Sequence, residues 1–347
     1  MPVRIHVATG APVDKAGGLN RVVSTIAAAQ RALGLDVRVV HSVRRDGYRV
    51  EGGTLPAVLS DTDVVMFHFA ATVRRATAIL PAGGKRVLHF HGPWSDEARV
   101  QGQAWWRVAA KKFVERRAYA RFTHFVTASD AFRDVLHEQY GVPLAAIVTV
   151  TPGVDVERFT PGDRDEARRV LGLTASGQVL ACVRRLEPRM GLRHLVRAMR
   201  EVEDVTLLVA GAGSLDGELR ALVKDLGLEA RVRLLGRVSD GDLVRLYQAA
   251  DASVVPTVAL EGFGLVVLES MACGAPVLAT RVGGLVEAMG PFADEWTVPP
   301  GDVGALATGI RAILHRSPSR TAVAGYAAGR SAELSARRME EVLDGFR

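Results

Sequence analysis

The sequence predicts an α/β protein made of two doubly wound halves, because short apolar segments alternate with amphipathic ones from end to end. Its 347 residues include 35 Gly, 15 Pro and 48% hydrophobic residues, which is enough for two domains with separate cores. This composition excludes disorder as the main state. The apolar runs have the length of strands, far below the roughly 20 residues that a membrane-spanning helix needs.

The first half begins with a strand-like run at residues 3–8, and no basic stretch with an apolar core precedes it, so we expect no secretion signal. An apolar stripe at helical spacing follows from Leu19 to Leu33, and Gly34 ends it. Further strand-length runs lie at 37–41, 64–69, 86–91, 124–127 and 147–150. Pro161 and Gly162 then interrupt the chain.

The second half repeats this pattern, with strands expected at 179–183, 205–210, 232–235, 252–255 and 276–279. Ligands bind beyond the carboxyl ends of the strands in such sheets, so two facing halves predict a cleft between them. The two cysteines, Cys182 and Cys273, lie in apolar runs. They exclude a disulfide framework and fit a reducing compartment.

Residues 261–269 combine glycines, a helix start and two carboxylates. The N–H groups of Phe263, Gly264 and Leu265 are the unpaired donors at the positive end of the expected helix and suit a diphosphate. Glu269 lies inside the helix among apolar residues. This favours a buried Glu269 carboxylate that accepts hydrogen bonds from ribose hydroxyls over a carboxylate on a solvated face of the helix. Glu261 precedes the helix, where the alternative role is a first-turn carboxylate that the helix dipole favours.

Two glycine turns are weaker signals. Gly17 and Gly18 lie between the first strand and the first helix, where they could hold an anion or simply allow tight packing. The turn from Gly211 to Gly213 is more simply a structural turn.

Residues 261–287, EGFGLVVLESMACGAPVLATRVGGLVE, resemble the E-x7-E region of the retaining GT-B glycosyltransferases of the family-four, or group 1, type. Further matches follow in the family's order along nearly the whole chain: AGGLNRVVSTIA, HFHG, VTASDAFRD, VTPGVDVERFTP, CVRRLEPRMGLRHLVRAM, LLVAGAGSL and LLGRVSDGDLVRLYQAADASVVP. The ordered set is specific, although no single member would be.

The resemblance implies two Rossmann-like domains that face each other across a cleft. It places an acceptor domain at residues 1–160, a nucleotide-sugar donor domain at 161–330, and a C-terminal helix at 331–347 that crosses back to the first domain. The implied donor contacts are Glu269 on the ribose, Glu261 on the sugar hydroxyls, the amides of Phe263, Gly264 and Leu265 on the diphosphate, Arg237 and Val238 at the base, and Gly17 and Gly18 near the β-phosphate.

The family also has an Arg and a Lys, in an RLxxxKG pattern, that neutralise the leaving diphosphate. Arg185 matches the Arg, but Met190 stands at the Lys position and cannot stabilise an anion. We expect Arg185 to act with help from Arg189, because an Arg guanidinium can bind two phosphate oxygens at once. The alternative for these arginines is a solvated basic loop.

His89 and His91 point to the same face of one strand, with His91 nearer its carboxyl end. The resemblance places His91 against the donor sugar, where a neutral ring would donate a hydrogen bond to a hydroxyl. His68, His89 and His124 receive structural roles. In a retaining reaction the departing diphosphate can accept the acceptor's proton, so we expect neither a protein nucleophile nor a metal or other cofactor. The expected catalytic residues are His91, Arg185 and Glu261.

Residues 103–122, QAWWRVAAKKFVERRAYARF, combine two Trp with a run of basic residues. Such a helix can lie on an anionic membrane. Alternatively, a stripe of Trp106, Ala110 and Phe113 packs on the first sheet while the basic residues face water. The chain has a net charge of +6 but no basic motif of a known nucleic-acid-binding protein, so nucleic acid is not an expected partner.

The sequence therefore favours a cytoplasmic hexosyltransferase, at most peripheral to the inner face of the membrane. It would use a nucleotide sugar, UDP-sugar first and GDP-sugar second, and a hydroxyl of a saccharide, lipid-linked or small-molecule acceptor. Two alternatives stay open. Met190, and Thr151 where relatives commonly have Asn, favour a nucleotide-sugar-binding protein without transfer activity. A GT-B epimerase shares the architecture but lacks the full E-x7-E set.

Overall fold

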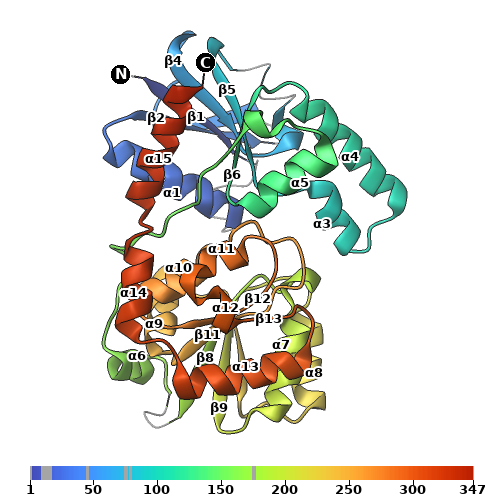
Figure 1. The fold of residues 1–347 in the computed structure, drawn as a ribbon, viewed down its shortest axis with the longest axis vertical. Coiled ribbons are helices and arrows are strands. Elements are labelled where there is room, and N and C mark those ends of the chain that lie inside the picture. Colours follow the sequence, from blue (N-terminus) through green and yellow to red (C-terminus); the bar gives the residue numbers. More distant parts are fainter. Residues whose placement is uncertain are drawn as a thin grey trace. The chain divides into compact units, whose positions relative to one another are not determined.

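The computed structural model describes residues 2–8, 18–43, 47–73, 77, 80–173 and 177–346. It divides into two compact units, unit 1 with Met1–Gly153 and Ala332–Arg347, and unit 2 with Val154–Ser331 (Figure 1). Val154 belongs to unit 2 because its N–H donates to the carbonyl of Arg330 and it forms a β-bridge with Ser331. The first boundary thus lies between residues 153 and 154, where the sequence suggested 160 and 161.

Unit 1 is a largely parallel sheet with helices on both faces. Over the described residues the strand order is β3-β2-β1-β4-β5-β6-β7, and only β3 runs antiparallel to its neighbour. Its strands are β1 (Val3–Ala8), β2 (Asp36–Val43), β3 (Gly47–Glu51), β4 (Val58–Phe67), β5 (Ala82–Phe90), β6 (His124–Thr127) and β7 (Ile147–Thr149). Its helices are α1 (Gly18–Ala32), α3 (Trp94–Val100), α4 (Trp105–Tyr119), α5 (Asp130–Tyr140) and α15 (Ala332–Gly345), with 3-10 turns at Ala70–Thr72 and Leu144–Ala146.

The strands that the sequence predicted from apolar runs in this half are confirmed, but it missed β3 and the first parts of β4 and β5. In β4, residues 60–63 carry polar side chains and look like a loop in the sequence. The register of β4 with β5 shifts between Leu59 and Val64, and there the Asp63 carboxylate accepts the N–H groups of Val3 at 2.6 Å and Ser60 at 2.7 Å.

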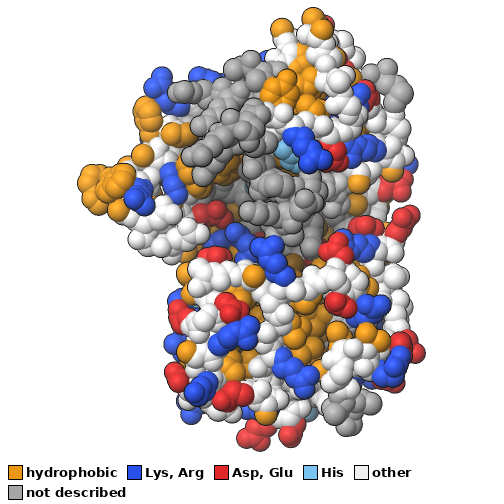
Figure 2. All heavy atoms as spheres, turned by 180° about the vertical axis from the view of Figure 1, so that it is seen from behind, with side chains coloured by type: hydrophobic (Ala, Val, Ile, Leu, Met, Phe, Trp, Pro, Cys, Tyr) orange, Lys and Arg blue, Asp and Glu red, His pale blue; other side chains and the backbone are white. Residues whose placement is uncertain are grey.

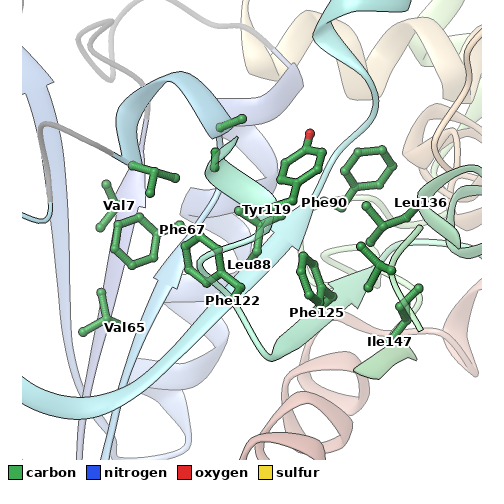
Figure 3. Packing of buried hydrophobic residues seen from close by; sticks show 14 of the residues in the cluster. Val7, Val65, Phe67, Leu88, Phe90, Tyr119, Phe122, Phe125, Leu136 and Ile147 are labelled. Carbon is green, nitrogen blue, oxygen red and sulfur yellow. The ribbon is translucent and has the colours of Figure 1, made fainter. Parts of the chain in front are cut away.

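Alternating side chains of the strands build two cores, one on each face of the sheet. On β4, Val65 and Phe67 pack with residues of α4 and α5, and Figure 3 shows this cluster of aromatic and aliphatic side chains. Val64 and Met66 face the other side and pack with Met339 of α15. Helix α1 covers β1 and β2 on that face, beside α15, so the C-terminal helix is part of unit 1.

Helix α4 does not pack as the apolar stripe suggested. Trp106 is 56% exposed and Phe113 60% exposed, so the expected packing of Trp106, Ala110 and Phe113 on the sheet is wrong. The buried side of α4 carries Glu115, Ala118 and Tyr119 instead. Glu115 sets this orientation because its carboxylate accepts the N–H groups of Trp94 at 2.5 Å and Ser95 at 3.3 Å, at the start of α3.

Unit 2 has a parallel sheet with the strand order β10-β9-β8-β11-β12-β13, the order of a Rossmann fold. Its strands are β8 (Gln178–Val183), β9 (Val205–Ala210), β10 (Val232–Gly236), β11 (Ala252–Val255), β12 (Val277–Thr280) and β13 (Thr297–Val298). Its helices are α6 (Arg164–Val170), α7 (Leu192–Ala198), α8 (Asp216–Asp225), α9 (Asp240–Ala249), α10 (Leu265–Ala272), α11 (Leu285–Met289), α12 (Ala293–Trp296), α13 (Val303–Arg316) and α14 (Arg320–Ala328), with 3-10 turns at Pro188–Met190, Met199–Glu201 and Gly290–Phe292.

The five strands predicted for unit 2 are confirmed, and the two-residue strand β13 was not predicted. Side-chain caps start several helices, such as Ser239 for α9 and Asp302 for α13. Cys182 and Cys273 are buried free thiols. Across the described residues, no helix has the length and apolar character needed to span a membrane.

Candidate active site

The sheet of unit 2 places its candidate residues beyond the carboxyl ends of its strands. Strands β8 and β11 lie side by side, and the chain leaves them toward opposite edges of the sheet. Ligands of doubly wound folds bind at the carboxyl ends of such a strand pair. Arg184 follows β8 here, and Thr257 and Glu261 follow β11.

A buried ion pair joins the ends of these two strands. One terminal nitrogen of Arg184, Nη2, donates to both the Glu261 carboxylate and the Thr257 hydroxyl, and the side chains of Arg184 and Glu261 are only 6% and 14% exposed. The Thr257 hydroxyl also donates to Glu261, at 3.3 Å. Among the described residues, Nε of Arg184 is buried without a hydrogen-bond partner.

The environment of Glu261 keeps it ionised. Burial alone would raise the pKa of this carboxyl, but the charges of Arg184 and Arg189 and the hydrogen bonds from Arg184 and Thr257 hold it below its usual range. A carboxylate of this kind accepts hydrogen bonds and does not supply protons. Glu261 is therefore suited to bind hydroxyl groups, and not to act as a general acid.

The loop from Arg184 to Gly191 contacts the loop after β11 through Arg184, Arg189 and Gly191. Arg189 donates to the carbonyl of Leu260 at 2.6 Å, and the carbonyl of Arg189 accepts the N–H of Val258 at 2.8 Å. Leu260 has a φ of +57°, in the left-handed region that non-glycine residues rarely adopt. Within this loop the side chain of Arg185 is exposed, and Met190 is only 4% exposed.

The N-terminus of α10 lies at the carboxyl end of the strands, after β11, and has no side-chain cap. Gly264, the N-cap residue, has a φ of +88°, and a Cβ atom there would overlap Leu285. Only glycine fits this position, so no capping side chain occupies the first N–H groups of the helix. Of the three amides that the sequence indicated, Leu265 is the first helical residue, Gly264 is the N-cap and Phe263 precedes the cap.

Glu269 is 4% exposed in α10, so the alternative of a solvated helix face is wrong. The Tyr247 hydroxyl donates to its carboxylate at 3.4 Å. Arg237 and Val238 follow β10, two strands away from β8 at the same edge, with Arg237 exposed and Val238 half-buried.

The turn from Gly211 to Gly213 has a structural role, as the sequence suggested. A Cβ atom at Gly211 would overlap the carbonyl of Arg184, and one at Gly213 would overlap that of Leu186. The N–H of Leu186 donates to the carbonyl of Ala212 at 3.1 Å. These contacts hold the Arg184 loop against the end of β9.

In unit 1, His91 comes directly after β5 and contacts His68, which comes directly after β4. Nδ1 of His68 lies 2.8 Å from Nε2 of His91, and Nε2 of His68 lies 2.9 Å from Nδ1 of His6. Burial lowers the pKa of His91 to about 3 and that of His6 to about 4. His68 and His89 also have pKa values well below their usual range, first because of burial and then because of the neighbouring histidines.

Ligand atoms of His68, His89 and His91 lie within 4.8 Å of one another, a spacing that a metal could use. Tetrahedral zinc holds histidine nitrogens about 2.0–2.1 Å from the metal, and therefore roughly 3.3 Å from each other. The 2.8 Å between His68 and His91 is a hydrogen-bond distance instead. We therefore interpret these two histidines as hydrogen-bond partners and not as metal ligands.

The other expected residues of unit 1 are placed as follows. Gly17 lies outside the described residues, and Gly18 is the first residue of α1. His124 stacks on Phe346, with ring centroids 4.4 Å apart, in keeping with a structural role.

Sequence reasoning missed two residues of the site. It named Arg185 and Arg189 as the working arginines, whereas Arg184 forms the ion pair with Glu261. It gave no role to Thr257. Their positions in the sequence could have indicated them, because both residues follow the ends of strands at the point where the strand order reverses.

Comparison with known proteins identifies the family. A family model described as glycosyl transferases group 1 matches residues 163–330, and one described as glycosyltransferase family 4 matches residues 54–158. A D-inositol 3-phosphate glycosyltransferase of Acidothermus cellulolyticus is 33% identical over 326 residues, which cover 79% of this chain and 72% of the relative. The chain belongs to the group 1 glycosyltransferases, which have the GT-B fold.

Other relatives match a smaller part. A D-inositol 3-phosphate glycosyltransferase of Mycobacterium sp. (strain KMS) is 44% identical over 178 residues, which is 50% of this chain and 40% of that relative. The chain thus covers less than half the length of this relative.

Solved structures share the whole fold. Sucrose-phosphate synthase of Thermosynechococcus elongatus superposes with a TM-score of 0.80 at 22% identity, covering 99% of this chain and 98% of the other. Anabaena HepE, solved with UDP and glucose, gives a TM-score of 0.77 at 21% identity and full coverage of both chains.

Proposed function

We propose that this protein is a glycosyltransferase that moves a hexose-type sugar from a nucleoside diphosphate sugar to a hydroxyl acceptor. The observation that carries the proposal is the site of unit 2, where a buried ion pair and an uncapped helix N-terminus meet at the reversal of strand order. The positive end of α10 suits the diphosphate. The carboxylates of Glu261 and Glu269 suit the sugar and ribose hydroxyls.

The protein's own part in the reaction would be binding, positioning and charge. Arg185 and Arg189 stabilise the negative charge that grows on the departing diphosphate, while Arg184 holds the Glu261 carboxylate in place. His91 contacts a hydroxyl of the donor sugar. No metal or other cofactor is needed for this scheme, in which the departing phosphate accepts the proton of the acceptor hydroxyl and the anomeric configuration is retained.

UDP-sugar is the proposed donor, with GDP-sugar second. The fold similarity to HepE, solved with UDP and with UDP-glucose, supports this choice. A starch synthase of the same fold was solved with ADP, so the architecture accepts other bases. The acceptor is a hydroxyl of a saccharide, lipid-linked or small molecule, and the name shared by several relatives makes D-inositol 3-phosphate one compound to test.

Thermal unfolding with UDP-, GDP-, ADP- and TDP-sugars tests donor binding. A ligand at 100 times its Kd stabilises the protein by about 2.7 kcal/mol. Glu269→Ala should lose this shift, and Arg185→Ala should keep most of it but lower turnover. Arg233→Ala, an exposed change on β10, is the control. An unchanged shift and turnover in both site variants would reject the site.

The same panel separates the alternatives. Nucleotide release that depends on an acceptor indicates transfer, a new epimer without release indicates an epimerase, and binding without either indicates a binding protein. The anomeric configuration of the product, read by NMR, tests retention.

We also propose that α4 contacts an anionic membrane surface, in a protein that works on the cytoplasmic side. Trp105 is 81% exposed and lies next to Trp106, and Figure 2 shows hydrophobic and basic side chains on the projecting side of unit 1 where α3 and α4 lie. The single acidic residue of α4, Glu115, is buried. Exposed aromatic rings beside uncompensated positive charge are typical of membrane-surface helices. The basic residues of α4 are Arg107, Lys111, Lys112, Arg116 and Arg117.

A further inference from the structure

A continuous chain of hydrogen bonds joins α15 to His91 within unit 1. Glu340 of α15 accepts from Nε2 of Gln30 at 2.6 Å, and Oε1 of Gln30 lies 2.6 Å from Nε2 of His6. Nδ1 of His6 lies 2.9 Å from Nε2 of His68, and Nδ1 of His68 lies 2.8 Å from Nε2 of His91. Gln30, His6 and His68 are each at most 1% exposed, so water does not compete for these bonds.

Charge fixes the direction of the first bond. Arg4, whose side chain is 3% exposed, donates through Nε to the second carboxylate oxygen of Glu340 at 2.7 Å. A carboxylate held by a buried guanidinium is ionised and can only accept. The amide of Gln30 must therefore turn its NH2 group to Glu340 and its oxygen to His6.

The direction of each further hydrogen bond follows from the one before it. Burial keeps His6, His68 and His91 neutral, because it lowers the pKa of each well below 6.5. A neutral imidazole has one N–H and one lone pair. The oxygen of Gln30 requires a proton on Nε2 of His6, so Nδ1 of His6 accepts from Nε2 of His68. In the same way, Nδ1 of His68 accepts from Nε2 of His91.

We propose that Glu340 and Gln30 are positioning residues that hold His91 in the Nε2–H tautomer, so that its Nδ1 offers a lone pair to the donor sugar. No described residue forms a hydrogen bond with this Nδ1. His91 would then accept a hydrogen bond from a sugar hydroxyl, the reverse of the donation expected from the sequence. The contact with sugar rests on the proposed function, but the tautomer does not.

Glu340→Gln reverses the chain by exchanging one oxygen for an NH2 group. Arg4 still requires an acceptor and takes the oxygen of the new amide, so the NH2 group faces Gln30. The Gln30 amide then turns over and donates to Nε2 of His6. Each ring in the chain changes its tautomer in turn, and His91 carries its proton on Nδ1.

The double variant Gln30→Glu/Glu340→Gln restores the original direction. A carboxylate at position 30 accepts from the amide at 340 and again requires a proton on Nε2 of His6. This variant is read at alkaline pH, so that His6 stays neutral beside the new charge. Glu341→Gln removes an exposed charge from the same helix and is the matched control.

Two-bond 1H–15N correlation spectra of 15N-histidine-labelled protein report which nitrogen of each ring holds the proton. We expect the Nε2–H form of His6, His68 and His91 in the wild type, the Glu341→Gln control and the double variant, and the Nδ1–H form in Glu340→Gln. An Nδ1–H signal of His91 in the wild type overturns the proposal. So does an unchanged His91 in a folded Glu340→Gln variant.

Activity supplies a second readout. With sugar donor, Glu340→Gln should lower kcat/KM by about threefold to tenfold, the size of one neutral hydrogen bond, and the double variant should recover it. If no donor is turned over, the proposed function fails while the tautomers can still be read without substrate.

Discussion

Replacement of Arg184 by Met should strongly destabilise unit 2. The side chains of Arg184 and Glu261 are 6% and 14% exposed, so the pair is shielded from solvent. Loss of the guanidinium leaves the carboxylate buried with the hydroxyl of Thr257 and the charge of Arg189. Removal of one partner from a buried ion pair costs about 3–5 kcal/mol. In a domain of 150–250 residues, each kcal/mol shifts Tm by about 2–4 °C, so a fall of about 6–20 °C is expected.

The loss should depend on pH in a defined direction. The pKa of Glu261 is held below the ordinary value of 4.5, so the pair stabilises the fold above that value and loses its effect as pH falls through the folded-state pKa. The gap between wild type and Arg184→Met should therefore narrow in acid, where Glu261 takes up a proton and no longer leaves an unpaired charge.

Scanning calorimetry of the wild type, Arg184→Met, Glu261→Gln and the double variant measures the coupling between the two side chains. The double variant should cost less than the sum of the single variants, because the second change removes a group that the first left unpaired. A fall of less than about 2 °C for Arg184→Met, or costs that simply add, would refute the buried pair.

Three further outcomes test the rest of the structure. Burial raises the pKa of the Cys182 and Cys273 thiols to about 12, so a thiol reagent at pH 8 should label neither residue until the protein unfolds, and rapid native labelling would contradict the core. Burial alone would raise the pKa of Asp63, but the N–H groups of Val3 and Ser60 hold it below 3.8. The free energy of unfolding of Asp63→Asn should therefore change less with pH below that value than that of the wild type. Identical acid unfolding of the two proteins would contradict this prediction. A variant with the basic residues of α4 changed to Gln should lose salt-sensitive co-sedimentation with vesicles of anionic lipid, and equal sedimentation of both proteins would reject the membrane proposal.

Local pattern was enough for most of the fold. The strands of unit 2 are continuous apolar runs, and Gly264 and Glu269 stand at fixed distances from a helix start, so neighbouring residues alone indicated a buried carboxylate and an uncapped N-terminus. Helix α4 shows where local pattern fails. Trp106 and Phe113 have the spacing of a buried stripe, but the orientation of the helix is set by Glu115, which accepts N–H groups of another helix.

Contacts between distant residues could not be predicted in this way. Arg184 and Glu261 are 77 residues apart and meet only because β8 and β11 are neighbours in the sheet. Gln30 and Glu340 are 310 residues apart and meet because α1 and α15 lie on the same face of unit 1. Neither pairing follows from composition or periodicity, since each depends on the order of strands and the return of the last helix.

The Met at position 190 is the main ground for a protein that binds a nucleotide sugar without transferring it. The contacts of the loop from Arg184 to Gly191 argue against this interpretation. Arg184 contacts Glu261, Arg189 contacts the carbonyl of Leu260, and a Cβ atom at Gly191 would overlap the carbonyl of Pro256.

The loop is held at both ends and in the middle, and the contacts that hold its two buried guanidinium groups do not involve the side chain at 190. Met190 itself is 4% exposed, and a Lys ammonium there would have to be buried near those cations. The site thus keeps a concentration of positive charge without the family's Lys, and we expect acceptor-dependent release of nucleotide rather than binding alone.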